Sequence, residues 1–405
     1  MRLQSRRPSR GDGGRPCGAV WERKGIAMSA TETRGLESVV AADTRLGAVD
    51  GTAGTLHYAG YSIGDLATRA SFEEALYLLL DGELPTAALL TALRAELMEA
   101  RDDAEALVIL RGLPVDGAPI DALRTAISVL AQHDPRVEDT SPANVRRIGV
   151  RLAALMPVAL AAIERRARGQ EPVAPNPALN HAANFLYMLH GAAPSAIAER
   201  AMDAYLVLLA EHGLNASTFA ARVAIGAGAD AYAALVAAVS TLKGDAHGGA
   251  NRRAMEMLRR IGGPERVADY IDESLRTHRR VMGIGHRIYK TRDPRARVLE
   301  ELARDLVEES GDSAPFETAR ELERVTAAHP HYVERKLYPN VEFFSAPVLH
   351  GLGIRAEAMP AVFALSRIAG WTAHIQEQLA DNRLIRPQAR YVGPAPRPFQ
   401  QVESR

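Results

Sequence analysis

Apolar residues recur at spacings of three and four along almost the whole chain after residue 70, which restricts the fold to packed amphipathic helices. At the start of this pattern, Ser71 and Glu74 have the spacing of a capping box, and Gly82 is a typical helix stop. The apolar face between them comprises Phe72, Ala75, Leu76, Leu79 and Leu80. The same pattern predicts helices at residues 118–132, 143–168, 177–189, 194–212, 216–242, 249–261, 264–279, 295–310, 316–328 and 358–380.

Only one segment favours β structure. Residues 45–63 contain the turn dipeptide Asp50-Gly51 among residues that favour strands, which predicts a small hairpin. The 216–242 segment is apolar on most sides and rich in Ala and Gly, so we expect one centrally placed helix there. Residues 386–405 contain four prolines and should be extended. The predicted fold is therefore all-α, with roughly 15–20 helices and a small N-terminal β-hairpin.

The composition excludes several classes of protein. Lys+Arg and Asp+Glu are equal at 49 each in 405 residues, which argues against a general nucleic-acid binder. No apolar run approaches the roughly 18–20 residues needed to span a bilayer, so no membrane association is expected. Cys17 is the only cysteine, so it can form neither an intrachain disulfide nor a cysteine-based metal site. A cytoplasmic location fits this cysteine usage best.

Residues 1–30 differ from the rest of the chain. They are rich in Arg, Gly and Pro and lack apolar periodicity, which is typical of a disordered tail. A mis-assigned start, with Met28 as the first residue, explains the segment at least equally well. Asp12, Glu22 and the many Gly and Pro residues argue against a transit peptide, and the lack of an apolar stretch excludes a signal peptide.

Two glycine-rich segments place a histidine between predicted helices. His247 lies in GDAHGGAN (244–251), where paired glycines let a ligand approach the backbone closely. His286 lies in VMGIGHRIYKTRDPRARVL (281–299), in which Asp293-Pro294 should begin a helix. For each histidine taken alone, a purely structural role in a turn or in the core explains the residue as well.

Other charged side chains lie in apolar surroundings. Glu342, in KLYPNVEFFSA (336–346), should have a raised pKa and act as a stronger base if it is buried; the alternative is an alternating segment with Glu342 in solvent. His212 lies in AEHGLNAST (210–218), which could equally be a simple helix break. Arg367 and Arg386 lie in SRIAGWTAHIQEQ and LIRPQARYVGP, where a buried arginine needs a carboxylate from the protein or from a ligand.

Taken together, these segments resemble the citrate synthase family, which includes 2-methylcitrate synthases. The resemblance covers roughly residues 34–394 and rests on the motifs GxxHGGAN, MGxGHRxYKxxDPR, LYPNVxF and GWxAHxxEQ, in this order. An early Tyr-x-Gly-Tyr-x-Ile segment also matches. Because the joint occurrence of these motifs by chance is negligible, the resemblance favours the functional interpretation of each segment over the structural one.

The resemblance implies a role for each residue. The catalytic set would be His247 holding the thioester enol, His286 polarising the carbonyl of oxaloacetate, and Glu342 at the position of the family's aspartate base. The dicarboxylate would be bound by His212, Arg295 and Arg367, with Arg386 reaching in from the other subunit. No cofactor and no metal is expected, because the coenzyme A thioester is itself a substrate and the HPH sequence at 329–331 lacks further ligands at usable spacing.

The resemblance also implies a homodimer of two-domain subunits. The large helical domain would comprise residues 31–248 and 354–405, the small helical domain residues 249–353, and residues 1–30 would lie outside both. The active site would lie in the cleft between the domains. Hexameric, NADH-inhibited members of the family have an additional N-terminal β-domain. The sequence shows no pattern for such a domain, so allosteric inhibition by NADH is not expected.

Several features depart from the family or leave alternatives open. Glu342 is one methylene longer than the usual aspartate, and Leu209 and Gly213 replace the usual histidine and acidic residue. A catalytically weak paralogue that binds acyl-CoA or dicarboxylate is therefore an alternative, as is a citryl-CoA lyase. Lys290 and Lys336, two of only four lysines, are candidates for contacting the coenzyme A phosphates.

Overall fold

The computed structural model describes residues 34–36 and 39–405, so the predictions for residues 1–30 lie outside the described residues. The chain divides into two compact units, Met1–Asp43 and Thr44–Arg405. In the first unit, Arg34–Leu36 form a single turn of 3₁₀-helix. The second unit contains every strand and α-helix discussed below.

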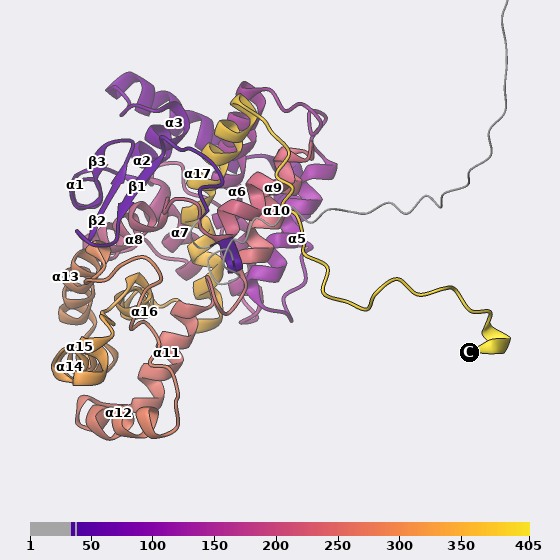
Figure 1. Ribbon diagram of the computed structural model, residues 1–405. Helices are drawn as coiled ribbons and strands as arrows, with labels where there is room; N and C mark the ends of the chain where they lie inside the picture. Colours follow the sequence, from indigo (N-terminus) through magenta and orange to yellow (C-terminus); the bar gives the residue numbers. More distant parts are fainter. Residues whose placement is uncertain (1–33, 37–38) are drawn as a thin grey trace, which may run out of the picture. The chain divides into compact units, whose positions relative to one another are not determined.

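The second unit is helical, as predicted, with 17 α-helices among the described residues (Figure 1). They are α1 (Ile63–Arg69), α2 (Phe72–Asp81), α3 (Ala87–Arg101), α4 (Ala104–Arg111), α5 (Pro119–Gln132), α6 (Pro142–Arg166), α7 (His181–His190), α8 (Ala196–Leu209), α9 (Ala216–Gly226), α10 (Ala231–Leu242), α11 (Ala250–Ile261), α12 (Val267–Arg276), α13 (Pro294–Ser310), α14 (Ala314–Ala328), α15 (Pro330–Glu334), α16 (Val341–Gly351) and α17 (Met359–Ala380). None of these helices combines the length and apolar character needed to cross a membrane.

The predicted hairpin is present and gains a third strand. Antiparallel strands β1 (Gly47–Asp50), β2 (Thr55–Tyr58) and β3 (Tyr61–Ser62) form one small sheet in that order. The β1–β2 turn is held by the Asp50 carboxylate, whose Oδ1 accepts the N–H groups of Thr52 and Ala53, both at 2.8 Å. Tyr58 is fully buried and fixes the sheet to the helical body.

Local capping signals in the sequence were reliable. Ser71 and Glu74 form the reciprocal capping box at the start of α2, and Gly82 ends that helix in the left-handed conformation at φ 88°. Asp293 caps α13, and Pro294 occupies its first turn. These ends were predictable because each depends on residues that are close in sequence.

The prediction of one helix over 216–242 is wrong. The segment forms α9 and α10, which are separated at Gly228, a residue with φ 88°. Asp230 then begins α10 by accepting the N–H of Ala233 at 2.9 Å. Uniform apolar composition concealed this break, because α9 and α10 pack against each other and both have buried faces.

Instead of that segment, α17 has the most thoroughly buried environment. Its side chains are buried along most of its length, and it packs against α2, α6, α8, α9 and α10. The backbones of α6 and α17 approach closely at Gly149, where a Cβ would lie 2.3 Å from Cγ2 of Thr372. The residues on α17 are therefore held rigidly.

The helices of the predicted small domain contact one another. α11 packs against α14 and α16, and α14 also packs against α12 and α15. α13 packs against α16 on one side and α8 on the other, so it connects this group with the remaining helices. The division into two domains stays a prediction.

Candidate active site

His247 lies in the turn between α10 and α11. This turn is tight, since a Cβ on Gly248 would lie 2.5 Å from the Leu242 carbonyl oxygen. The Ser217 N–H donates to Nε2 of His247 at 3.3 Å, and the Ser217 hydroxyl lies 2.8 Å from the same nitrogen. Because Nε2 accepts, the proton of the neutral ring belongs on Nδ1. Burial, reinforced by the charge of Arg367, lowers the pKa of His247 to about 4.

The His286 ring is also fixed by hydrogen bonds from backbone N–H groups, but its accepting nitrogen is Nδ1 rather than Nε2. Its Nδ1 accepts the backbone N–H groups of Ile288 at 3.0 Å and Tyr289 at 3.1 Å. The proton of the neutral ring therefore belongs on Nε2, which is left free to donate. Burial lowers the pKa of His286 to about 4; Arg295 adds to this effect and Asp293 opposes it.

His212 and Tyr289 complete a cluster of rings with His286. The ring centroids of His212 and His286 are 5.6 Å apart, and Nε2 of His212 lies 3.2 Å from the Tyr289 hydroxyl. Burial lowers the pKa of His212, and the nearby guanidinium groups of Arg295 and Arg367 lower it further. The three predicted site histidines are thus neutral at pH 7.

Two arginines lie close enough to influence these rings, and both are buried. Arg295 is 2% exposed and donates through Nε and Nη2 to the two oxygens of Asp293, at 3.0 and 2.7 Å. Arg367 is 1% exposed, and its Nε donates to the Leu209 carbonyl at 2.6 Å. Among residues 34–36 and 39–405, no carboxylate forms an ion pair with Arg367. A buried guanidinium in this state is suited to an anionic ligand.

Glu342 lies in the first turn of α16 and is half-buried, so the alternative of an extended, alternating segment is wrong. Its N–H donates to the Asn340 side chain at 3.1 Å. The same Asn340 side chain donates to the Gly285 carbonyl at 2.8 Å, which ties the start of α16 to the turn before His286. Removal from solvent raises the pKa of Glu342, and the positive charge of Arg295 opposes this rise. The carboxylate therefore has the character of a general base.

Three predicted residues are not brought into this cluster. Arg386 is exposed in the extended segment after α17, without a hydrogen bond or ion pair to the described site residues. Lys290 is exposed next to the His286 loop, and its Nζ donates to the Arg287 carbonyl at 3.3 Å. Lys336 is exposed before α16 and has a positive φ of 52°.

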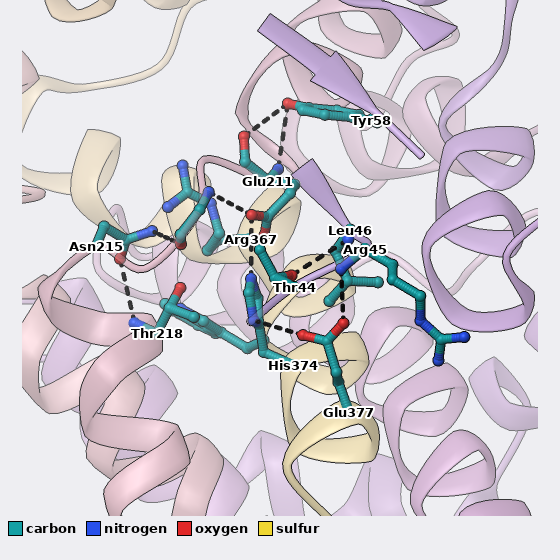
Figure 2. A network of polar contacts seen from close by, with 12 residues as sticks. Thr44, Arg45, Leu46, Tyr58, Glu211, Asn215, Thr218, Arg367, His374 and Glu377 are labelled. Atoms are coloured by element: carbon teal, nitrogen blue, oxygen red, sulfur yellow. Dashed lines mark hydrogen bonds and ion pairs between the residues drawn. The ribbon is translucent and has the colours of Figure 1, made fainter. Parts of the chain in front are cut away.

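A buried polar network behind the site was missed at the level of sequence (Figure 2). Nδ1 of His374 accepts Nε–H of Arg222 at 3.0 Å, and Arg222 also pairs with Glu377. Nε2 of His374 therefore carries a proton, which it donates to Oε1 of the fully buried Glu211 at 3.1 Å. This network fixes the segment that carries His212. His374 and Glu377 are part of the GWxAHxxEQ motif, so the motif was the available signal.

Ser217, Tyr289 and Trp371 were also missed as site residues. The Trp371 Nε1–H donates to the Ser217 hydroxyl at 3.1 Å, which supports the residue that orients His247. All three lie within or beside segments that the sequence analysis singled out. Their roles depend on contacts between distant segments, which no local pattern contains.

No group of three or more His, Cys, Asp or Glu side chains in the described part of the chain is arranged to hold a metal ion. The site is instead composed of neutral histidines, buried arginines and a carboxylate with a raised pKa. Such a set can donate hydrogen bonds to a developing enolate, bind carboxylates and remove a proton from carbon.

Comparisons with known proteins agree with this chemistry. The family model described as citrate synthase, C-terminal domain, matches residues 35–388. A citrate synthase of Haloferax volcanii is 42% identical over 93% of this chain and 100% of the relative. A 2-methylcitrate synthase of Mycobacterium tuberculosis is 38% identical over 89% of this chain and 90% of the relative.

A solved structure extends the similarity to the fold. The citrate synthase of Thermoplasma acidophilum, determined as a ternary complex with carboxymethyl coenzyme A and oxaloacetate, superposes with a TM-score of 0.86. It is 31% identical, and the match covers 92% of this chain and 98% of that one. The fold and the site together define an acyltransferase-type condensing enzyme. Because these matches extend over nearly the whole chain at such identity, the chain belongs to the citrate synthase family.

Proposed function

We propose that this enzyme condenses a short acyl-CoA, acetyl-CoA or propionyl-CoA, with oxaloacetate to give citrate or 2-methylcitrate and free coenzyme A. The observation that carries this proposal is the pairing of two neutral, oppositely oriented histidines with a carboxylate of raised pKa. The presence of both citrate synthases and a 2-methylcitrate synthase among its relatives supports both acyl groups.

In the proposed reaction, Glu342 removes a proton from the α-carbon of the thioester. His247 donates a hydrogen bond from Nδ1–H to the developing enolate oxygen. The enol carbon then attacks the ketone carbon of oxaloacetate, whose oxygen is polarised by Nε2–H of His286 and is protonated to the hydroxyl. Water finally hydrolyses the thioester of the adduct and releases the coenzyme A thiol.

The guanidinium of Arg367, which forms no ion pair with a carboxylate within the described residues, is the strongest support for a dicarboxylate substrate. We assign one carboxylate of oxaloacetate to Arg367 and His212, and the other to Arg295 together with Arg386 of the other protomer. Asp293 accepts hydrogen bonds from two nitrogens of Arg295, which fixes the orientation of the Arg295 guanidinium for this role. The exposure of Arg386 in an extended segment is compatible with its insertion into a neighbouring subunit.

The remaining parts of the proposal concern assembly and coenzyme A. We propose a cytoplasmic homodimer with shared active sites, whose cleft lies between residues 249–353 and the larger helical body. Lys290 and Lys336 are exposed beside the His286 loop and the Glu342 helix, which suits a contact with the phosphates of coenzyme A. No cofactor enters this scheme.

One observation keeps a second candidate function open. Glu342 extends one methylene beyond the usual aspartate, and a displacement of about 1 Å can lower the rate about 100-fold in an aligned site. A weak paralogue that binds acyl-CoA and dicarboxylate would follow from such a displacement. The raised pKa of Glu342 favours an active base.

The deciding experiment mixes the purified protein with oxaloacetate and either acetyl-CoA or propionyl-CoA and follows free thiol. We expect thiol release with both thioesters, since one methylene in a pocket is worth only about 1–3 kcal/mol. Binding of oxaloacetate by calorimetry without thiol release would identify the binding protein instead. Cleavage of citryl-CoA to acetyl-CoA and oxaloacetate, with no free thiol released in either direction, would identify the lyase.

A further inference from the structure

The turn between β1 and β2 lies directly against the loop that follows His286. The Lys290 N–H donates to the Gly51 carbonyl at 2.8 Å. A Cβ on Gly51 would lie 2.3 Å from the Ile288 carbonyl oxygen, and a Cβ on Gly54 would lie 2.6 Å from Cγ2 of Thr291. Gly51 and Gly54 thus let the turn contact the loop after His286 at two points. A side chain at either position would displace that loop.

The opposite side of the same loop holds the histidine. The carbonyl of Ile288 faces Gly51, while its N–H donates to Nδ1 of His286 at 3.0 Å. The next residue, Tyr289, donates its own N–H to the same nitrogen and directs its hydroxyl to His212. A shift of the Ile288 backbone therefore changes the orientation of the His286 ring and the proton on its Nε2.

The sheet that carries this turn is itself fixed to the segment containing the other histidine. The Tyr58 hydroxyl lies 3.0 and 2.9 Å from the carbonyls of Leu208 and Glu211, and it accepts the Glu211 N–H at 3.2 Å (Figure 2). A Cβ on Gly47 would lie 3.1 Å from Cγ of Glu211. The sheet therefore contacts both segments that bear the oxaloacetate-facing histidines.

We infer that the Asp50–Gly54 turn is a positioning element for His286, and that Gly51 and Gly54 are positioning residues for the condensation reaction. The turn supports the backbone of Ile288 from behind, so that His286 points Nε2–H at the substrate carbonyl. This inference rests on the proposed function, because it assigns the turn to the binding of oxaloacetate. A misplacement of about 1 Å at such a group can lower the rate about 100-fold.

The test compares Gly54→Ala with Gly60→Ala. Both glycines have positive φ, 68° and 90°, so both substitutions introduce the same kind of backbone strain into one sheet. Only Gly54 faces the His286 loop; nothing lies within 4 Å of a Cβ on Gly60. We expect Gly54→Ala to raise the KM for oxaloacetate about tenfold or more and to lower kcat, and Gly60→Ala to change neither more than about twofold.

Thr291→Ser provides a rescue, because it removes the Cγ2 atom that the new methyl group would meet. The double variant Gly54→Ala/Thr291→Ser should recover the KM for oxaloacetate to within about threefold of the Thr291→Ser single variant. The KM for acyl-CoA at saturating oxaloacetate should stay nearly constant throughout. Thermal unfolding of all four variants separates these effects from a loss of fold.

Two results would overturn the inference: Gly54→Ala kinetics equal to those of Gly60→Ala, or no recovery in the double variant. If Gly54→Ala does not fold, Gly51→Ala replaces it, since the φ of Gly51 lies outside the left-handed range and only the contact with Ile288 opposes the substitution. If the Gly51→Ala variant has the same kcat and the same KM for oxaloacetate as the unmodified enzyme, the inference is likewise overturned. Absence of thiol release from the unmodified enzyme would overturn the proposed function instead.

Discussion

At the scale of single residues, the site depends on keeping its histidines neutral. His247 and His286 have pKa values lowered to about 4, and each accepts a backbone N–H with one nitrogen. The backbone thereby selects Nδ1–H for His247 and Nε2–H for His286. In the proposed reaction, neutral rings would donate hydrogen bonds to the enol and the carbonyl without introducing a positive charge beside two arginines.

Glu342 should be the base. Glu342→Gln should lower kcat at least about 1,000-fold and leave oxaloacetate binding nearly intact, because the amide cannot accept the α-proton. Steady-state thiol release and calorimetry with oxaloacetate measure the two quantities. Glu342→Asp, the matched variant that keeps the charge, should retain more activity than the Gln variant. A Gln variant with near-normal kcat would remove Glu342 from the mechanism.

The lowered histidine pKa values predict a pH dependence of stability. Between pH 6.5 and about 4 the unfolded chain binds protons that folded His247 and His286 do not, so the free energy of unfolding falls as the pH falls. Urea unfolding at pH 7 and pH 5 measures this loss. The double variant His247→Asn/His286→Asn should lose less stability over the same interval; an equal loss would show that these rings do not contribute.

The lysines give a further prediction at this scale. Lys336→Ala or Lys290→Ala should raise the KM for acyl-CoA several-fold at low salt and leave the KM for oxaloacetate nearly unchanged, because an exposed ammonium group attracts phosphate. Lys243→Ala is the matched control, since Lys243 pairs with Asp121 at 2.7 Å. Wild-type coenzyme A kinetics in both test variants would contradict the proposed contact.

At the scale of elements, the sequence predicted those helices whose ends carry their own signals. α2 and α13 have side-chain caps, and both were predicted closely. The segment 216–242 and the helix α16 were not, although Asp230 caps α10 and Asn340 caps α16, because the apolar residues around these caps concealed where one helix ends and the next begins. For the site, the motifs contain Tyr289, but its contact with His212, like that of Ser217 with His247, exists only in the folded chain.

Asn340 links two elements of the site, α16 and the turn before His286. Asn340→Ala removes both the cap on α16 and the bond to the Gly285 carbonyl, so it should lower kcat about tenfold or more and stability by about 1 kcal/mol. Asn340→Asp keeps a capping oxygen and should recover stability but not kcat. Rates and urea unfolding are measured together.

Asp230→Ala is the control for the Asn340 variants. It removes the cap of α10 and should lower stability by about 1 kcal/mol without lowering kcat. If Asn340→Ala and Asp230→Ala have the same kcat, the connection through Asn340 has no role in the reaction.

At the scale of the whole molecule, the proposed dimer makes each active site a product of two chains. Homodimers of Arg386→Ala and of His247→Ala should both be nearly inactive. Mixed heterodimers should regain up to one intact site, because each chain supplies the residue that the other lacks. Differently tagged chains allow the heterodimers to be purified and assayed. Lack of activity in verified heterodimers would place Arg386 in its own subunit.

The burial of α17 has a consequence for how this enzyme can be altered. Arg367, Trp371 and His374 occur at intervals of four and three along that helix, so one helical face presents the Arg367 guanidinium proposed to bind substrate, supports Ser217 and anchors Glu211. Because the helix is enclosed by other helices, substitutions among its buried residues 359–375 cannot be accommodated by outward movement. Directed evolution toward other thioesters will therefore find its productive changes in the connecting loops, whereas α17 will tolerate little diversity.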